Sequence, residues 1–339
     1  MNFVVDNMTS LRYLVPITIC GNKRSIKSDY FICKDNRKYN SCSIKENLEQ
    51  LVQLSKIYNF NIHDVDKIND FTGLTFFVEG GGNQYTHDNL KKVSITYMSD
   101  FIVLYQKYIS DIDYVIFPNK FFAEFYKDKS TYPVGGGPMG ETLSEKDKNL
   151  YLGASKYDIV IDKKEVIKKY SLPNDKNALI IFPLLSFVSP ELIEKIYMFL
   201  KQLGFTIIVK SRAKDNAPNH LHGDYFFNDV NWFPHVTMEL IEAVDIVVNF
   251  GSTTIKECIM ANKPVVNFEI RNFKHLEFLY DGNHCIDLDI NEVDFNTFKN
   301  SINKLLTSDL SNDFELARKK FLFEKGNICN NILDLLYDE

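Results

Sequence analysis

Short apolar runs alternate along the chain with stretches in which apolar residues recur at helical spacing. The apolar runs are rich in β-branched residues and predict strands at 12–19 (RYLVPITI), 74–80 (LTFFVEG), 92–98 (KVSITYM), 113–118 (DYVIFP), 178–185 (ALIIFPLL), 205–211 (FTIIVKS), 245–251 (DIVVNFG) and 263–270 (KPVVNFEI). The amphipathic stretches predict helices at 44–58, 100–110, 120–126, 163–170, 189–203, 237–243, 253–261 and 295–306. Such alternation is typical of a parallel sheet covered by helices, so we expect an α/β fold.

A segment without a strong hydrophobic period separates two such halves. Residues 132–158 are rich in Gly, Pro and charge, and residues 175–212 then give strand, turn, helix and strand, which is a βαβ unit. We therefore predict two doubly wound, Rossmann-like domains facing a cleft, one over 1–165 and one over 166–320. The helical spacing near the end predicts that 321–339 form a C-terminal helix that packs back across the domains.

Composition and charge restrict the function classes. The chain has 339 residues, of which 45% are hydrophobic and 25% charged, so two cores of ordinary size can be buried. The formal net charge of -6 argues against a general affinity for nucleic acid or anionic lipid, because both require a basic surface. Any anion-binding site must therefore be local.

Cysteine spacing and the N-terminal residues indicate a reduced, unexported protein. The six cysteines are scattered without CxxC spacing, which suggests neither a zinc cluster nor a disulfide framework. The start, MNFVVDNMTS, has an acid where a signal peptide has lysine or arginine, and no apolar stretch approaches the ~20 residues that span a bilayer. We expect a cytoplasmic protein with no integral membrane segment.

Three Asp-x-Asp triplets raise the question of a divalent metal. They are Asp64/Asp66, Asp111/Asp113 and Asp287/Asp289. In a chain this rich in aspartate such triplets are expected by chance, so we predict no metal.

The corner after the strand at 245–251 is a candidate phosphate site. It reads Gly251, Ser252, Thr253, Thr254, and a predicted helix follows. Glycine permits close approach of a ligand, the first helical turn offers unpaired N–H groups, and the hydroxyls can cap the helix or donate to phosphate. Glu257, one turn later, could accept hydrogen bonds from two ribose hydroxyls. The same residues also fit an ordinary capped turn, so both interpretations stay open on this evidence.

The wider run ELIEAVDIVVNFGSTTIKECIMANKPVV resembles the nucleotide-binding segment of GT-B glycosyltransferases and of the related UDP-N-acetylglucosamine 2-epimerases. That segment reads aspartate, apolar strand, small Ser/Gly corner, glutamate, then Gly-Lys-Pro-Val. Asn262 stands where these families usually have glycine, and asparagine also visits the left-handed region. Gly153, Asp158 and Pro173 resemble the domain junction of CDP-glycerol glycerophosphotransferases, and the whole resemblance covers about residues 150–335.

The resemblance implies that the domain at 166–320 binds a nucleotide sugar and the domain at 1–165 binds the acceptor. The strand at 205–211 brings Lys210 and Arg212 to its carboxyl end, where open α/β sheets bind ligands. Arg212 would then clamp the diphosphate and Lys210 add a point charge. His235 precedes the helix that leads to the corner strand, in a loop that meets the nucleotide base in GT-B proteins. A solvated charge run and an ordinary helix-leading histidine are the alternatives.

Candidate catalytic residues in the first half are Glu79, His87, Asp88 and Asp100, one of which would take the proton of the acceptor hydroxyl. Glu79, followed by three glycines, resembles the glutamate of the epimerase motif His-Val-Glu-Ala-Gly, but Phe77 replaces the histidine. For each candidate, a cap or surface role is the alternative. After the predicted first strand, Lys23 and Arg24 could reach phosphate.

The resemblance implies a metal-independent glycosyltransferase that moves a sugar from a nucleotide-diphosphate sugar to a hydroxyl of a glycan or glycolipid, as in polysaccharide biosynthesis. No cofactor is expected, a UDP-sugar is the favoured donor, and a homodimer is left open. A sugar 2-epimerase or a CDP-glycerol-type phosphotransferase on the same fold is one alternative. A non-catalytic binding or scaffold protein is another.

Overall fold

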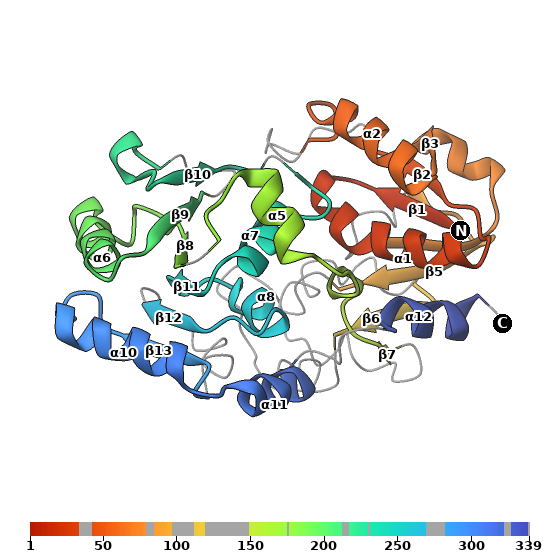
Figure 1. The fold of residues 1–339 in the computed structure, drawn as a ribbon. Coiled ribbons are helices and arrows are strands. Elements are labelled where there is room, and N and C mark those ends of the chain that lie inside the picture. Colours follow the sequence, from red (N-terminus) through yellow and green to blue (C-terminus); the bar gives the residue numbers. More distant parts are fainter. Residues whose placement is uncertain are drawn as a thin grey trace. The chain divides into compact units, whose positions relative to one another are not determined.

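The computed structural model describes residues 1–33, 43–78, 85–96, 112–118, 149–174, 176–211, 217–229, 231–268, 282–321 and 327–337. The chain divides into two compact units (Figure 1). Unit 1 consists of Met1–Ile159 together with Lys320–Glu339, and unit 2 is Val160–Lys319. The helices predicted at 100–110 and 120–126 lie outside the described residues.

Unit 1 contains a seven-stranded sheet in which the strands run parallel, in the order β3-β2-β1-β4-β5-β6-β7. The strands are β1 (Asn2–Val5), β2 (Asp29–Ile32), β3 (Asn61–Asp64), β4 (Gly73–Val78), β5 (Leu90–Ile95), β6 (Tyr114–Phe117) and β7 (Asn149–Tyr151). The described helices of this unit are α1 (Leu11–Lys23), α2 (Leu48–Tyr58) and α12 (Ile328–Leu336), with 3-10 turns at Met8–Ser10, Val65–Asp70 and Ser155–Tyr157.

The strand predicted at 12–19 is wrong, because these residues form most of α1. This helix contacts α2, α12, β4 and the 3-10 turn Ser155–Tyr157, so its residues are buried almost all round. A helix buried on every side shows a continuous apolar run instead of a 3.6-residue period, and Val15 and Ile17 gave that run a strand-like composition. The first strand is instead β1, whose four residues are all buried.

Unit 2 contains a six-stranded parallel sheet in the order β10-β9-β8-β11-β12-β13 (Figure 1). The strands are β8 (Asn177–Ile181), β9 (Thr206–Lys210), β10 (Tyr225–Phe227), β11 (Ile246–Asn249), β12 (Val265–Phe268) and β13 (Cys285–Leu288). The described helices are α5 (Lys163–Tyr170), α6 (Pro190–Gln202), α7 (Val236–Ala243), α8 (Ile255–Met260), α10 (Phe295–Thr307) and α11 (Ser311–Phe321), with a 3-10 turn at Asn219–Leu221. The four strands predicted in this half are confirmed as β8, β9, β11 and β12.

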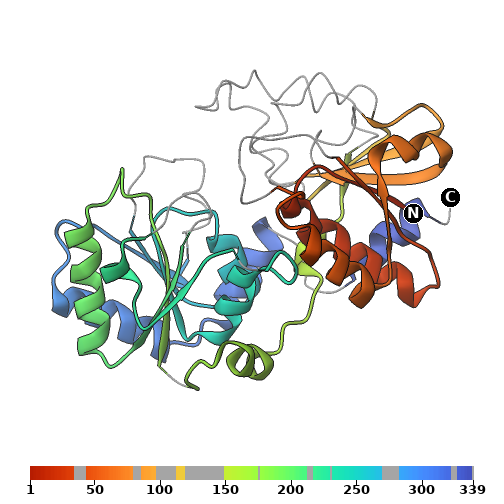
Figure 2. The ribbon, with the colours of Figure 1, turned by 90° about the horizontal axis from the view of Figure 1, so that it is seen from above.

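Helices cover both faces of the unit 2 sheet (Figure 2). On one face α6 contacts β9 and α10, and α10 contacts β12 and β13. On the other face α7 contacts β8, α5 and α8. Val248 and Val266 belong to the core cluster on the α10 side, together with Phe298 of α10. Because successive strand side chains point to opposite faces, Val247 and Val265 face the α7 side.

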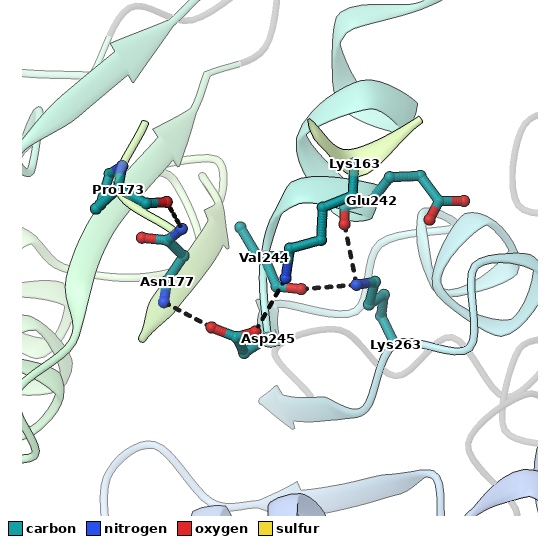
Figure 3. Close-up of polar contacts among 7 residues, drawn as sticks. All are labelled: Lys163, Pro173, Asn177, Glu242, Val244, Asp245 and Lys263. Atoms are coloured by element: carbon teal, nitrogen blue, oxygen red, sulfur yellow. Dashed lines mark hydrogen bonds and ion pairs between the residues drawn. The ribbon is translucent and has the colours of Figure 1, made fainter. Parts of the chain in front are cut away.

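Asp245 organises the amino edge of this sheet (Figure 3). Its carboxylate accepts a hydrogen bond from the backbone N–H of Asn177 at 2.9 Å and lies 3.3 Å from the Lys163 ammonium. Asn177 in turn donates from its side-chain amide to the carbonyl of Pro173 at 2.7 Å. These contacts join the starts of α5, β8 and β11.

Lys263, from the Lys-Pro of the sequence motif, lies at this same amino edge (Figure 3). Its ammonium donates to the carbonyl oxygens of Glu242 at 3.0 Å and Val244 at 2.8 Å, so it satisfies carbonyls at the end of α7. Burial lowers the pKa of Lys263, and the nearby Lys163 adds to the effect. The lysine of this motif therefore has a structural role in this chain.

The C-terminal helix α12 packs on α1 within unit 1. The Asp158 carboxylate accepts a hydrogen bond at 2.8 Å from the backbone N–H of Cys329, in the first turn of α12, where negative charge is favourable. From α1 the Arg24 guanidinium pairs with Asp334 at 2.5 Å and donates to the Asn330 side chain at 2.8 Å. Segments more than 300 positions apart in sequence thus share one core.

Candidate functional site

The switch point of the unit 2 sheet lies between β8 and β11, at its centre. The chain leaves β8 for α6 on one face and leaves β11 for α8 on the other. In open parallel sheets, ligands bind beyond the carboxyl ends of the strands at the point where these connections diverge. Only Phe250 separates β11 from the predicted corner, so the structure places Gly251–Thr254 at this point.

The backbone geometry of the corner bears on the predicted phosphate site. Gly251 has φ +57, in the left-handed region that favours glycine, and its N–H donates to Asn267 Oδ1 at 3.0 Å. Ser252 Oγ and Thr254 Oγ1 are hydrogen-bonded at 3.0 Å, and the Thr254 side chain makes no capping bond to α8. Among the described residues, none accepts a hydrogen bond from the backbone N–H of Ser252 or Thr253.

Glu257 lies in the first turn of α8 and is half-buried. It stands within one helical turn of Thr254, the last residue of the corner, and the sequence assigns it to the ribose. That assignment stays a prediction.

The far end of α8 confirms the interpretation of Asn262. This residue has φ +54 directly after the C-cap of α8, so asparagine adopts the left-handed conformation that glycine would otherwise supply. The Arg318 guanidinium donates to the Asn262 side chain and to the Ile259 carbonyl at 3.4 Å. α11 thereby holds the end of α8.

Lys210 and His235 converge on a carboxylate that the sequence analysis did not identify, Asp229. The Lys210 ammonium lies 2.7 Å from Asp229 Oδ1, and His235 Nε2 lies 3.1 Å from the same oxygen. Burial alone raises the pKa of Asp229, but the His235 hydrogen bond and the Lys210 charge outweigh it and hold the pKa below its ordinary value. Because the ionised carboxylate can only accept, His235 Nε2 carries the proton of this hydrogen bond.

Lys210 belongs to a row of polar side chains that crosses the sheet near the carboxyl ends of its strands. The other polar members of this row are Asn249, Asn267 and Asp287. The strand register aligns Lys210 with Ile181 and aligns Asn249, Asn267 and Asp287 with one another. Their strand positions alternate with core residues on the α10 side, so the row lies on the α7 and α8 face, at the carboxyl edge. The row of the opposite face instead ends in phenylalanines, including the stacked pair Phe250 and Phe268 with ring centroids 5.4 Å apart.

Two of the predicted catalytic residues, His87 and Asp88, lie in the described part of unit 1. His87 and Asp88 immediately precede β5, at the amino edge of the sheet. The His87 ring contacts the Ile68 carbonyl at 3.3 Å, and Asp88 is exposed and lies 3.9 Å from the Lys92 ammonium. Their catalytic roles stay predictions.

Three of the predicted site residues, Glu79, Asp100 and Arg212, lie outside the described residues. Glu79 follows Val78, the last residue of β4, in the sequence.

Asp6 is a carboxylate that the sequence analysis missed. It directly follows β1, which neighbours β4 at the switch point of the unit 1 sheet, and its Oδ1 accepts hydrogen bonds from Asn7 Nδ2 at 2.7 Å and Ser10 Oγ at 3.0 Å. The strand predicted at 12–19 puts the loop after the first strand at Lys23 and Arg24. That expectation is wrong, since both residues lie at the C-terminal end of α1.

Within the described ranges, no group of three or more His, Cys, Asp or Glu side chains is placed to hold a metal ion. The same ranges contain no helix whose length and apolar character suit a bilayer crossing.

No protein-family model and no curated protein sequence matches the chain. Solved structures do match over its whole length. A proposed UDP-N-acetylglucosamine 2-epimerase of Listeria monocytogenes superposes with a TM-score of 0.67 at 9% identity, covering 99% of this chain and 95% of that chain. The Methanocaldococcus jannaschii UDP-GlcNAc 2-epimerase in complex with UDP-GlcNAc and UDP gives 0.56 at 11%, covering 100% and 99%.

A transferase structure matches in the same way. The spinosyn forosaminyltransferase SpnP gives a TM-score of 0.55 at 11% identity, covering 100% of both chains. At these identities the likeness concerns the fold, and it confirms the predicted fold class: the chain is an α/β protein with two Rossmann-like domains of the GT-B type. The predicted cleft between the domains stays a prediction.

Proposed function

We propose that this GT-B chain is a metal-independent glycosyltransferase that moves a sugar from a nucleotide-diphosphate sugar, with UDP as the favoured nucleotide, to a hydroxyl of a glycan or glycolipid. The observation that carries the proposal is the corner Gly251–Thr254 at the switch point of the unit 2 sheet, with two backbone N–H groups that no described residue engages. Peptide N–H groups at such a place suit phosphate oxygens.

Each donor group has a proposed partner. The diphosphate lies against Ser252, Thr253 and Thr254, with Arg212 as a further cation, and Glu257 accepts the ribose hydroxyls. The complex of the M. jannaschii epimerase with UDP-GlcNAc and UDP supports a nucleotide sugar as ligand of this fold. The Lys210 charge is engaged by Asp229, so we assign Lys210 and His235 to holding the loop before α7 beside the nucleotide.

Acceptor activation is proposed for unit 1. A carboxylate that removes the proton of the attacking hydroxyl has to stand at the carboxyl edge of that sheet, and Asp6 is the described carboxylate at its switch point. Glu79, next in sequence after β4, is the second candidate. His87 and Asp88, at the opposite edge, become weaker candidates for this proton transfer.

Calorimetric titration with UDP, GDP, CDP, CMP and dTDP tests the proposal. Trp232 is the single tryptophan, is buried, and lies with its ring 6.2 Å from that of His235, so its fluorescence gives a second binding signal in the same unit. We expect one nucleoside diphosphate, UDP, to bind selectively. Glu257→Ala should weaken that binding by about 10-fold, the loss expected for hydrogen bonds to a charged group.

The matched control is Glu194→Ala, an exposed glutamate on α6. It should bind UDP as the unmodified protein does. Failure of all five nucleotides to bind would overturn the proposal and favour a non-catalytic scaffold. Selective binding of CDP would instead favour a CDP-glycerol-type phosphotransferase, the class that Gly153, Asp158 and Pro173 resemble in the sequence.

A sugar 2-epimerase is the second candidate, because epimerases share the fold over the whole chain. Phe77 argues against it: this residue is 0% exposed in β4 and stands where the epimerase motif has histidine, so it cannot move a proton. Incubation with UDP-N-acetylglucosamine alone, followed by NMR, separates the two reactions. Formation of the 2-epimer without an acceptor would establish epimerisation, whereas transfer requires an added glycan.

A further inference from the structure

The tetrapeptide VVNF occurs twice, at 247–250, where it covers the end of β11 and the next residue, and at 265–268, where it forms β12. The two strands pair in register, so that Asn249 stands opposite Asn267. Both side chains are 0% exposed, in strands that are otherwise apolar. A buried amide is costly unless its hydrogen bonds are made, so two of them side by side call for a physical reason.

The two amides form a hydrogen-bonded ladder that reaches from the corner to the edge strand. Asn249 Nδ2 donates to Asn267 Oδ1 at 2.8 Å, and Asn267 Nδ2 donates to Asp287 Oδ1 at 2.6 Å. At the corner end, the N–H of Gly251 donates to Asn267 Oδ1 at 3.0 Å, and Asn249 Nδ2 donates to the carbonyl of Ser252 at 3.2 Å. The peptide groups on either side of the Gly251–Ser252 peptide bond are thus attached to side chains of β12 and β11.

The ends of the ladder fix its direction. The Gly251 N–H can only donate, which makes the Asn267 oxygen the acceptor at that end. An ionised Asp287 can only accept, which turns the Asn267 amide nitrogen toward β13. With Asn267 fixed from both sides, Asn249 must present its nitrogen to Asn267 and to the Ser252 carbonyl. Reversal of either amide would break these bonds.

We propose that Asn267 and Asp287 are positioning residues for the corner. Asn267 holds the Gly251 N–H directly and the Ser252 carbonyl through Asn249, and Asp287 fixes Asn267, so that the corner keeps the orientation that receives the anionic part of the ligand. This inference rests on the proposed function, under which that part is the diphosphate of a nucleotide. Neither residue needs to touch the ligand, because each acts through the peptide groups of the corner.

An exchange of the two residues tests the proposal without changing the size of any side chain. Asn267→Asp can still accept from the Gly251 N–H and from Asn249 Nδ2 but places two carboxylates in contact, so we expect the Kd of UDP to rise about 10-fold or more. The double variant Asn267→Asp, Asp287→Asn restores a donor opposite an acceptor and should bring the Kd back to within about 3-fold of the unmodified value. UMP, which lacks the second phosphate, should be affected less than UDP.

Asp287→Ala provides an independent measurement should Asn267→Asp not fold, because Asp287 lies at the exposed end of the ladder. It should raise the Kd of UDP by about 5-fold, while a single cooperative unfolding transition followed by Trp232 fluorescence shows that the variant still folds. Asp289→Asn, an exposed aspartate two residues on that bonds to Asn291 instead, is the matched control and should leave the Kd unaltered.

The outcomes separate this inference from the function on which it rests. Absence of nucleotide binding by the unmodified protein would overturn both. Normal binding by the unmodified protein and by every ladder variant would overturn the positioning role alone. Loss of binding in Asn267→Asp that the double variant fails to restore would also overturn it, because the ladder would then not be the cause.

Discussion

At the scale of single residues, the buried carboxylate of Asp229 determines how much of the Lys210 charge is available to a ligand. Its side chain is 12% exposed and holds the Lys210 ammonium and the His235 imidazole on one oxygen. A cation paired in this way offers less charge to a ligand than an unpaired lysine at the same strand end would. The sequence predicted a basic strand end at Lys210, and the structure shows that the charge there is compensated within the fold.

Asp229→Asn should destabilise unit 2 by about 3 kcal/mol at neutral pH, because it leaves two buried basic groups without a counter-ion. The pKa of Asp229 is lower in the folded protein than its ordinary value of 3.8, so the unfolded chain binds more protons below that pH. The stability difference between the two proteins is therefore full at neutral pH and should shrink as the pH falls below about 3.8.

Urea unfolding followed by Trp232 fluorescence measures this difference. Glu315→Gln, which breaks an exposed pair with Lys319 on α11, should leave the free energy of unfolding almost unchanged, because surface ion pairs contribute little. Equal losses in Asp229→Asn and Glu315→Gln, or a difference independent of pH, would contradict the assignment.

At the scale of elements, the hydrophobic pattern predicted correctly those strands that are buried on both faces of a sheet. The unit 2 strands β8, β9, β11 and β12 are buried on both faces and show as apolar runs at the expected positions. The pattern failed for α1, whose burial on all sides removes the helical period. Short strands such as β10, with three half-buried residues, leave too little signal to be recognised.

The corner could be predicted as a candidate phosphate site because glycine, serine and threonine are residue types that suit such a site. The side chains that hydrogen-bond to the corner could not be predicted. Asn249 and Asn267 lie inside apolar runs, and a single asparagine in a strand indicates nothing by itself. The repeated VVNF is the available signal, but its meaning depends on β11 and β12 being neighbours in register. Asp229 depends likewise on the pairing of β9 with β10, which the sequence pattern does not reveal.

The variant Lys263→Met tests whether the lysine of the Lys-Pro motif stabilises the end of helix α7 or binds the ligand. Methionine keeps the aliphatic stem but removes the donor to the Glu242 and Val244 carbonyls, so the free energy of unfolding should fall by about 1–2 kcal/mol. UDP binding should remain normal, since Lys263 lies at the amino edge of the sheet, away from the corner. Unfolding and calorimetry on the same variant check both statements, and lost binding with unchanged stability would show a ligand role instead.

At the scale of the whole molecule, unit 1 is completed by a helix from the other end of the chain. Ile332 of α12 is 0% exposed, and Ile332→Ala should destabilise unit 1 by about 3 kcal/mol through the cavity it leaves. Leu335, on the same helix, is 39% exposed, so Leu335→Ala should cost less than about 1 kcal/mol. Hydrogen exchange of α1 peptides should accelerate in the first variant only. Similar acceleration in both would mean that α12 is not part of this core.

The insertion of unit 2 within unit 1 also has a consequence for synthesis on the ribosome. Residues 160–319 emerge as one continuous segment, so unit 2 can complete its sheet while the chain is still being made. Unit 1 begins first but receives α12 last, and until then the surface of α1 that α12 covers is open to water. We therefore expect a stage during synthesis at which unit 2 is folded while unit 1, whose first residues were made earlier, is still incomplete. At that stage an apolar strip of α1 is available to chaperones.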